Sequence, residues 1–297
     1  MSRVAFLGLG AIGRPMAGRL ASAGLDLAVW NRTPARAAAF ATEHPRVTVA
    51  ATPRDAATGR DVVITCVSTS RDVEALLDGP DGLMAGLRSG ALLVDCTSGD
   101  PTMSRRIASR LAERGVAFVD APVSGGVSGA EKGTLTVMCG GAADAIERAD
   151  AVLRAFAGKI VRCGDVGAGH AVKAVNQYLL AAHIWSLAEG LALLARNGVD
   201  AAVALDIINA SSGRSNVSQN LFPERVVTRA FPRTFRLALL DKDVGIACAA
   251  AREHRLPSPM LQLTAEMMTL ARRELGEEAD HVEAARIVEQ WAGVEIR

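Results

Sequence analysis

Short apolar runs alternate with segments of helical character over about the first 164 residues of the chain. Thr52-Pro53 and Asp100-Pro101 mark two helix starts, because each places a capping side chain before a proline at the first helical position. Strands that alternate with helices are typical of a doubly wound, mostly parallel sheet, so we expect an α/β domain here. Its strands are expected at Val4–Leu7, Leu27–Trp30, Val62–Val67, Ala91–Cys96, Val116–Val119 and Thr134–Cys139.

The pattern changes after the glycine-rich segment Cys163–Gly169, beyond which no strand signal is convincing. Residues 169–196 are rich in Ala and Leu and apolar on more than one face, so this helix must be buried in a core or against a second subunit. We therefore expect an α/β domain over residues 1–164 and an all-helical domain over 165–297. Helices of the second domain are expected at Gly169–Arg196, Ala201–Ala210, Val244–Glu253, Met260–Leu275 and His281–Trp291.

Composition narrows the class of protein. The 297 residues are 49% hydrophobic and 22% charged with a net charge of +1, which is typical of a globular chain and argues against a nucleic-acid partner. No run of 18 uninterrupted apolar residues is present, and the chain enters a strand at Val4, so we expect neither a membrane span nor a signal peptide. Five cysteines without a C-x-x-C pair indicate reduced thiols and a cytoplasmic location. The histidines and cysteines show no metal-ligand spacing, so no metal is expected.

A glycine-rich loop follows the first expected strand. It reads Gly8-Leu9-Gly10-Ala11-Ile12-Gly13 and opens a helical segment. In a dinucleotide-binding loop the first glycine allows a tight turn, the second lets the backbone approach a pyrophosphate, and the third lets the helix pack on the strand. The helix N-terminus adds unpaired N–H groups. These six residues predict a Rossmann-like domain that binds a dinucleotide.

The end of the second expected strand bears on the choice of cofactor. An NAD site usually shows an acidic residue here for the ribose diol, but this chain has Asn31-Arg32-Thr33. A guanidinium and a hydroxyl suit a 2′-phosphate, so NADP is expected, with NAD as the alternative. The plainer interpretation is that Arg32 is a solvated loop cation.

Four segments, taken in order, resemble the β-hydroxyacid dehydrogenases, a family that includes 3-hydroxyisobutyrate dehydrogenases and tartronate semialdehyde, succinic semialdehyde and glyoxylate reductases. The likeness runs over essentially the whole chain and implies a second domain similar to the C-terminal domain of 6-phosphogluconate dehydrogenase. Ile12 stands where many members have Met, a change without chemical consequence. The segments are Gly8–Ala17, Asp120–Gly126, Gly169–Gln177, and Phe235 with Lys242-Asp243.

The resemblance assigns the substrate side of the site. Ser124, Gly125 and Gly126 look like the family's substrate-binding signature. Successive backbone N–H groups and the Ser124 hydroxyl could hold a carboxylate, although an ordinary glycine turn would have the same sequence. Lys173 lies in the most apolar helix, where an ammonium is costly unless it faces a cleft or reaches the helix rim. In the family this lysine is the general acid/base, and Asn176 positions the substrate. Asn176 and Gln177 share the helix face of Lys173.

Other residues are expected beside the cofactor. Thr97 follows the strand Ala91–Cys96 and should lie near the nicotinamide, and Val67 ends a neighbouring strand. By resemblance, Phe235 and Lys242 close over the cofactor from the second domain, with Lys242 reaching across a cleft. The alternative for Lys242-Asp243 is an exposed charge pair at a helix start.

Together these features predict hydride transfer between NADP, or NAD, and a small 3-hydroxy acid or its semialdehyde. An imine reductase of the same fold is the nearest alternative, and the retained Lys173 argues against it. A non-catalytic NADP-binding scaffold is a second alternative. The apolar surface of residues 169–196 indicates a homodimer or homotetramer.

Overall fold

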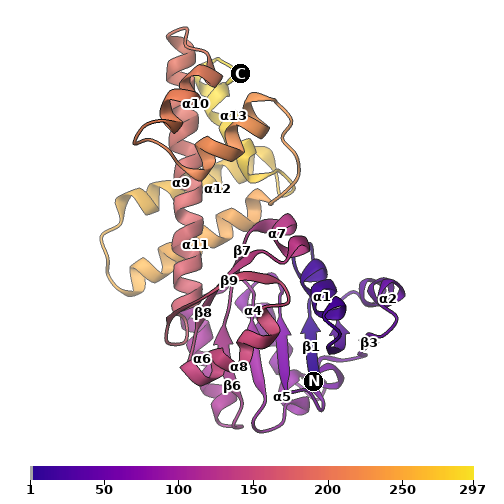
Figure 1. Ribbon diagram of the computed structural model, residues 1–297. Coiled ribbons are helices and arrows are strands. Elements are labelled where there is room, and N and C mark those ends of the chain that lie inside the picture. The colour runs from indigo at the N-terminus through magenta and orange to yellow at the C-terminus, as the bar shows by residue number, and fades with distance from the viewer. Residues whose placement is uncertain (1–2) are drawn as a thin grey trace. The chain divides into compact units, whose positions relative to one another are not determined.

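The structure is a computed structural model that describes residues 3–297. It forms two compact units, of which the first ends at Lys173 and the second begins at Ala174. The division falls inside helix α9 (Ala168–Arg196), which contributes its first turns to one unit and the rest to the other (Figure 1).

A nine-stranded sheet forms the centre of the first unit, in the order β3-β2-β1-β4-β5-β6-β8-β7, with β9 paired to β8. The first six strands along the chain, β1 to β6, are mutually parallel. Strand β8 pairs antiparallel with β6 and β7. The chain order reverses between β1 and β4, and ligands of such sheets bind outside the carboxyl ends at this point. The strands are β1 Arg3–Leu7, β2 Asp26–Trp30, β3 Thr48–Val49, β4 Val62–Thr65, β5 Leu92–Asp95, β6 Ala117–Asp120, β7 Val123–Ser124, β8 Leu135–Gly140 and β9 Ala157–Gly164.

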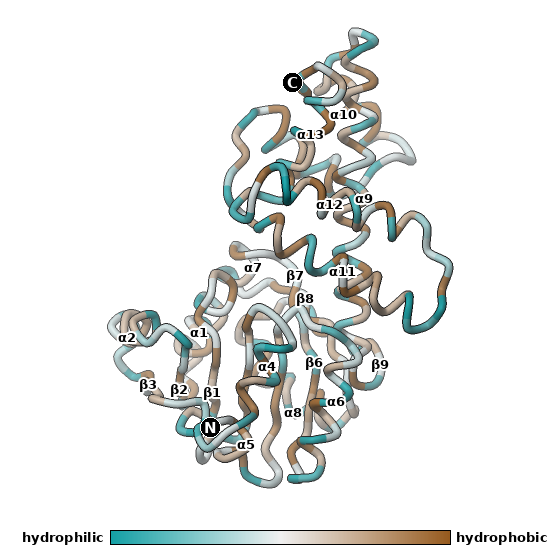
Figure 2. The backbone as a smooth tube through the Cα atoms, turned by 180° about the vertical axis from the view of Figure 1, so that it is seen from behind, coloured by the Kyte–Doolittle hydropathy of each residue, from teal (hydrophilic) through white to brown (hydrophobic). Residues whose placement is uncertain are grey.

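Both faces of the sheet are covered by helices, which explains why its central strands are continuous apolar runs. In β1, Val4 and Phe6 pack into one core, and Ala5 and Leu7 pack into another on the opposite face. The strands are coloured as mostly hydrophobic in Figure 2. The first core takes residues from α1, α2, α7 and α8, and the second from α3 to α6. The helices of this unit are α1 Gly13–Ser22, α2 Pro34–Glu43, α3 Pro53–Ala57, α4 Ser70–Leu77, α5 Leu83–Gly86, α6 Pro101–Ala112, α7 Gly126–Lys132 and α8 Ala143–Leu153.

The second unit is helical throughout and has a core of its own, built around Ile184 and Leu191 of α9 together with Phe222, Leu240 and Met268. Asp200 caps α10 by accepting hydrogen bonds from two amides of its first turn. Besides the long part of α9, the elements of this unit are α10 Ala201–Asn209, the π-helix η1 Val217–Val227, α11 Leu237–Glu253, α12 Pro259–Leu275, the 3₁₀ helix η2 His281–Ala284 and α13 Ala285–Ala292.

Among the described residues, one helix, α9, is long and apolar enough by length and composition alone to cross a membrane. Core helices of soluble proteins pass the same test. The absence of a membrane span therefore stays a prediction.

The structure confirms the α/β class and the helical second half, and it corrects several element boundaries. Strands β3, β7 and β9 and the helix η1 were not expected from the pattern. Strand β4 ends at Thr65 rather than Val67, because the chain turns there toward the end of β5. Helix α11 begins at Leu237 instead of Val244, so Lys242 and Asp243 lie within the helix and not at its start.

Candidate active site

The glycine-rich loop connects β1 to α1 at the point where the strand order reverses. Gly8 has a φ of 108°, and a Cβ there would lie 2.2 Å from the Cys66 carbonyl oxygen. A Cβ on Gly13 would lie 2.0 Å from the Gly8 carbonyl oxygen. Neither position can hold a side chain without moving the backbone. These contacts are the tight turn and the close helix packing that the sequence predicts.

The same loop is open on the side of Gly10. A Cβ on Gly10 would meet no atom within 4 Å. Ile12 provides no side-chain cap to α1, and the first turn of this helix has no acidic residue. Its amide groups are thus not bonded by a capping side chain and face no local negative charge, which suits phosphate binding. Among the other loop residues, Ala11 is exposed and the Leu9 side chain is buried in the core.

At the end of β2, the three predicted residues have different roles in the protein. The Asn31 Oδ1 atom accepts a hydrogen bond from the Leu9 amide at 2.9 Å, and its Nδ2 donates to the Thr33 carbonyl oxygen at 3.1 Å. Asn31 therefore ties the glycine-rich loop to this strand end. The Arg32 side chain is 86% exposed and lies 3.7 Å from Asp72. Thr33 is exposed and precedes α2 without capping it.

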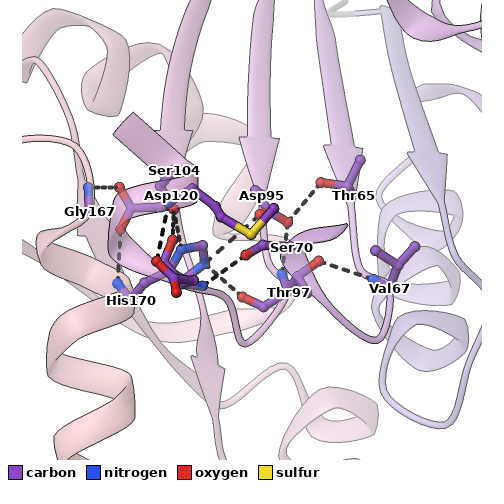
Figure 3. Close-up of polar contacts among 11 residues, drawn as sticks. Thr65, Val67, Ser70, Asp95, Thr97, Ser104, Asp120, Gly167 and His170 are labelled. Atoms are coloured by element: carbon purple, nitrogen blue, oxygen red, sulfur yellow. Dashed lines mark hydrogen bonds and ion pairs between the residues drawn. The ribbon is translucent and has the colours of Figure 1, made fainter. Parts of the chain in front are cut away.

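Val67 and Thr97 lie together beyond the ends of β4 and β5. The Val67 amide donates to the Thr97 Oγ1 at 3.1 Å. The Thr97 amide in turn donates to the Asp95 Oδ1 at 3.0 Å, and the Thr65 hydroxyl donates to the same oxygen at 2.9 Å. Thr97 is 1% exposed, so its hydroxyl is a fixed part of this strand end. The two loops are thereby held in register (Figure 3).

Ser124, Gly125 and Gly126 follow β6 at the same edge of the sheet. Ser124 pairs with Thr136 of β8 and is half-buried. Gly125 and Gly126 have φ values of 133° and 65°, are exposed, and lead into α7. The backbone here needs glycine and is open to a small ligand, as a carboxylate site requires.

Helix α9 holds Lys173, Asn176 and Gln177 within two turns, so the three side chains leave from one side of the helix. Lys173 is 8% exposed. In the second unit, the Asn176 Nδ2 atom donates to the Gln177 Oε1 at 3.3 Å, and the Gln177 Nε2 donates to the Asp243 Oδ2 at 3.0 Å. Gln177 is therefore part of the packing between α9 and α11.

Lys242 and Phe235 lie in the second unit. The Lys242 Nζ forms an ion pair with the Asp243 Oδ1 at 2.9 Å, and Asp243 is buried. Phe235 packs edge-on against His281, with ring centroids 5.6 Å apart, in the segment before α11. The interpretation of Lys242-Asp243 as an exposed charge pair is wrong for Asp243, because α11 and Gln177 bury its carboxylate.

A buried polar cluster lies in the first unit, at the ends of β5 and β6, and was not predicted as part of the site. Asp95, Ser104, Asp120 and His170 are each at most 2% exposed. Two of them could have been found, because Asp95 and Asp120 each end a strand whose other residues are apolar, where an ionisable side chain needs a partner. No pattern in the sequence indicates that Ser104 and His170 meet.

The electrostatics of this region favour protonated thiols and a carboxyl with a shifted pKa. Burial raises the pKa of the Asp120 carboxyl, an effect that His170 and the backbone amides partly offset. Burial also raises the pKa of the Cys66 thiol to about 12, so this cysteine is not a nucleophile at neutral pH. Within residues 3–297, no group of His, Cys, Asp or Glu side chains could hold a metal ion.

Comparison with known families gives two matches along the chain. Residues 3–164 match the NAD binding domain of 6-phosphogluconate dehydrogenase. Residues 167–288 match the NAD-binding domain of NADP-dependent 3-hydroxyisobutyrate dehydrogenase.

Individual relatives match over nearly their whole length. The 2-(hydroxymethyl)glutarate dehydrogenase of Eubacterium barkeri is 34% identical over 99% of this chain and 97% of its own. The 3-hydroxyisobutyrate dehydrogenase of Pseudomonas aeruginosa is 35% identical over 91% of this chain and 92% of its own. Among solved structures, the 3-hydroxyisobutyrate dehydrogenase of Mycobacterium tuberculosis, solved with L-serine, is 30% identical with a TM-score of 0.90, and the match covers 97% and 99% of the two chains. Two imine reductases are more distant, at 20% and 21% identity, which shows a shared fold alone.

Proposed function

Since this chain belongs to the β-hydroxyacid dehydrogenase family and is an NAD(P)-dependent hydroxyacid dehydrogenase, we propose that it interconverts a small 3-hydroxy acid and its semialdehyde, with Lys173 as the acid/base. One observation carries the assignment. Lys173 is 8% exposed on α9, one turn before Asn176. A buried lysine has a high desolvation cost, which is consistent with a functional role rather than a surface one.

Each group has a defined task in this reaction. The loop Gly8–Gly13 would hold the pyrophosphate of a nicotinamide dinucleotide, which would supply the hydride acceptor for oxidation and the hydride donor for reduction. Lys173 as a neutral amine takes the hydroxyl proton during oxidation. As an ammonium it stabilises the developing alkoxide during reduction and returns the proton as the alcohol forms. Asn176 orients the substrate hydroxyl, and the segment Ser124–Gly126 holds the carboxylate.

Replacing Lys173 tests the proposal. Lys173→Ala should lower turnover about 10²- to 10⁴-fold, the usual cost of losing a general acid/base. Cofactor affinity should change little, because the dinucleotide is held elsewhere. The exposed Lys159 of β9 offers a matched control, and Lys159→Ala should keep wild-type turnover. Steady-state kinetics over a panel of 3-hydroxy acids, with a cofactor titration on each variant, gives both quantities. A Lys173→Ala enzyme that keeps more than roughly a tenth of the turnover contradicts the assignment.

NADP is the proposed cofactor in preference to NAD. Arg32 supports this choice because its guanidinium is exposed at the end of β2, and positions 31–33 carry no carboxylate. A charge-assisted contact with the 2′-phosphate contributes about 1.5–3 kcal/mol, or roughly tenfold or more in affinity. Arg32→Asp should weaken NADP binding by that factor and spare NAD, whereas Arg36→Ala on the exposed side of α2 should leave both unchanged. Equal wild-type affinity for the two cofactors would count against this choice.

The protein is further proposed to act as a cytoplasmic homodimer or homotetramer, without a nucleic-acid or membrane partner. Large apolar side chains of the second unit support self-association, since Leu193, Val203 and Ile207 are 65%, 54% and 60% exposed. All five cysteines are free, as the reducing cytoplasm favours. Light scattering at micromolar concentration measures the mass. A monomer would overturn the assembly.

A further inference from the structure

The start of α9 is capped by a residue that is distant in the sequence. Asp120, the last residue of β6, is fully buried. Its Oδ1 atom accepts a hydrogen bond from the Gly167 amide at 2.7 Å, and its Oδ2 accepts one from the His170 amide at 2.8 Å. These two amides belong to the residue before the helix and to its first turn, where N–H groups have no partner within the helix. A carboxylate at this end also complements the helix dipole.

The backbone of α9 lies directly on the strand ends. A Cβ on Gly169 would be 2.2 Å from the Met138 carbonyl oxygen and 2.9 Å from the Asp120 Oδ2. A Cβ on Gly140 would be 2.5 Å from the Asp120 Oδ1. Glycine at both positions thus lets the helix and the carboxylate approach each other. The helix start is therefore packed tightly against these strand ends.

His170 connects the same helix turn to the loops that follow β4 and β5. Its ring is fully buried, with Nε2 at 2.7 Å from the Thr97 carbonyl oxygen and Nδ1 at 2.6 Å from the Ser104 Oγ. The nearest carboxylate oxygen of Asp95 is 3.9 Å from Nε2. Figure 3 shows Asp120, Gly167 and His170 at one side of this group and Thr97 with Val67 at the other. Thr97 in turn holds Val67, so a continuous chain of hydrogen bonds joins the helix to both loops.

Lys173 follows His170 by three residues, which is about one helical turn. Any tilt or slide of the first turn of α9 therefore moves the Lys173 amine relative to Thr97. A misplacement of about 1 Å can cost about 100-fold in rate. We propose that Asp120 is a positioning residue of the reaction, which acts with His170 to hold Lys173 in place against the Thr97 and Val67 loops. This inference rests on the proposed role of Lys173 as the acid/base.

The stability of the fold does not require the buried polar cluster of Asp95, Ser104, Asp120 and His170. A Rossmann-like sheet can be stabilised by apolar contacts alone, and buried charged groups contribute little net stability compared with apolar groups of similar size. What hydrogen bonds add is direction, because each fixes a donor and an acceptor at one distance and angle. Four buried polar residues that converge one turn before the acid/base suit positioning better than they suit stability.

The test is Asp120→Asn, which keeps the shape but replaces one acceptor oxygen with an NH₂ group facing an amide donor. Turnover should fall about 10- to 100-fold, with KM and the cofactor dissociation constant within about twofold. Asp200→Asn is the matched control, since Asp200 also caps a helix through two amides, but that helix carries no proposed catalytic residue. It should keep wild-type turnover. Ser104→Ala, which removes only the hydroxyl at His170, is the milder variant if Asp120→Asn does not fold, and it should lower turnover several-fold.

A double-mutant cycle separates positioning from a general structural effect. If Asp120 acts through Lys173, Asp120→Asn should cost less than about twofold in turnover when Lys173 is already Ala. Independent multiplication of the two losses would overturn the inference, and so would wild-type turnover of both Asp120→Asn and Ser104→Ala. Those results leave the proposed function intact as long as Lys173→Ala is inactive. Near-normal turnover of Lys173→Ala itself would overturn both.

Discussion

Each unit of the molecule uses a buried aspartate to hold distant backbone segments, and the two carboxylates differ in the donors that they accept. Asp120 in the first unit accepts two backbone amides. Asp280 in the second unit accepts the amides of Thr234, Phe235 and Val282 and the Thr234 hydroxyl, and it lies 2.9 Å from the Nδ1 of His281. Both side chains have no exposed surface.

The difference in donors gives the two carboxyls opposite pKa shifts. Burial raises the pKa of Asp120, and its partners offset this only in part. Burial also pushes the pKa of Asp280 upward, but the bonds from His281 and the backbone amides outweigh it, so the pKa lies below its usual value. A buried carboxylate is therefore favoured as an anion only when enough donors surround it. Asp280 binds the segment before α11 with several donors, whereas Asp120 accepts fewer donors and lies beside the proposed acid/base.

The largest expected effect on stability comes from adding a methyl group at Gly169, beside Asp120. Gly169→Ala would place a Cβ against the Met138 carbonyl oxygen and the Asp120 carboxylate. We expect a loss of about 3 kcal/mol in the free energy of unfolding, because backbone must shift. Gly190→Ala in the same helix is the control, since a Cβ there meets no atom within 4 Å and should stabilise the protein by about 0.5–1 kcal/mol. Urea titrations measure both, and similar values for the two variants would show that the helix start is not tightly seated.

A second, smaller effect is the response of the two carboxylates to pH. Asp280 is more acidic in the folded protein, so the stability it contributes, on the order of 2 kcal/mol, is present above about pH 4 and is lost as the pH falls through its lowered pKa. Asp120 is less acidic in the folded protein, so its contribution is largest at low pH and declines as the pH rises from about 4 through its raised pKa.

Unfolding titrations between pH 3 and pH 7 on the wild type, Asp280→Asn and Asp120→Asn separate these contributions. The advantage of the wild type over Asp280→Asn should shrink toward pH 3. Its advantage over Asp120→Asn should not shrink in the same direction. Parallel curves for the two variants would contradict the opposite pKa shifts.

The strands that are buried on both faces of the sheet were the elements that the sequence predicted well. Strands β1 and β2 begin one residue before their expected positions and end where expected, because a strand covered on both faces is a continuous apolar run. Strand β3 was missed because Thr48 and Val49 are exposed at the sheet edge, and β9 because most of its residues are polar or partly exposed. Helix η1 was missed because it contains Pro223 and several polar residues.

In the candidate site, too, residues that local backbone geometry requires were predictable, and contacts between distant segments were not. Gly8 and Gly13 were predictable because a tight turn and close helix packing require glycine, whereas the hydrogen bond from the Leu9 amide to Asn31 was not expected. The long-range contacts of the site were not predictable from the sequence. Asp120 contacts His170 across 50 residues of sequence, and Gln177 contacts Asp243 across 66. Such contacts depend on how strands and helices pack, and no period or spacing in the sequence records them.

The smallest expected effect on stability comes from removing one of the hydrogen-bond donors to the Asp280 carboxylate. The Thr234 hydroxyl donates to the Asp280 Oδ2 at 2.9 Å, and the Thr234 amide donates to the same oxygen at 2.6 Å. Thr234→Val removes this hydroxyl, which also accepts a hydrogen bond from the Arg225 Nη1 at 2.6 Å, and it keeps the side-chain shape and leaves the amide in place. Because several donors still hold the carboxylate and Thr234 is exposed, we expect a loss of about 1 kcal/mol or less. Thr234→Ser retains the hydroxyl and should be nearly neutral in the same urea titration. A loss from Thr234→Val as large as that from Asp280→Asn would mean that this hydroxyl, and not the set of donors together, stabilises the Asp280 anion.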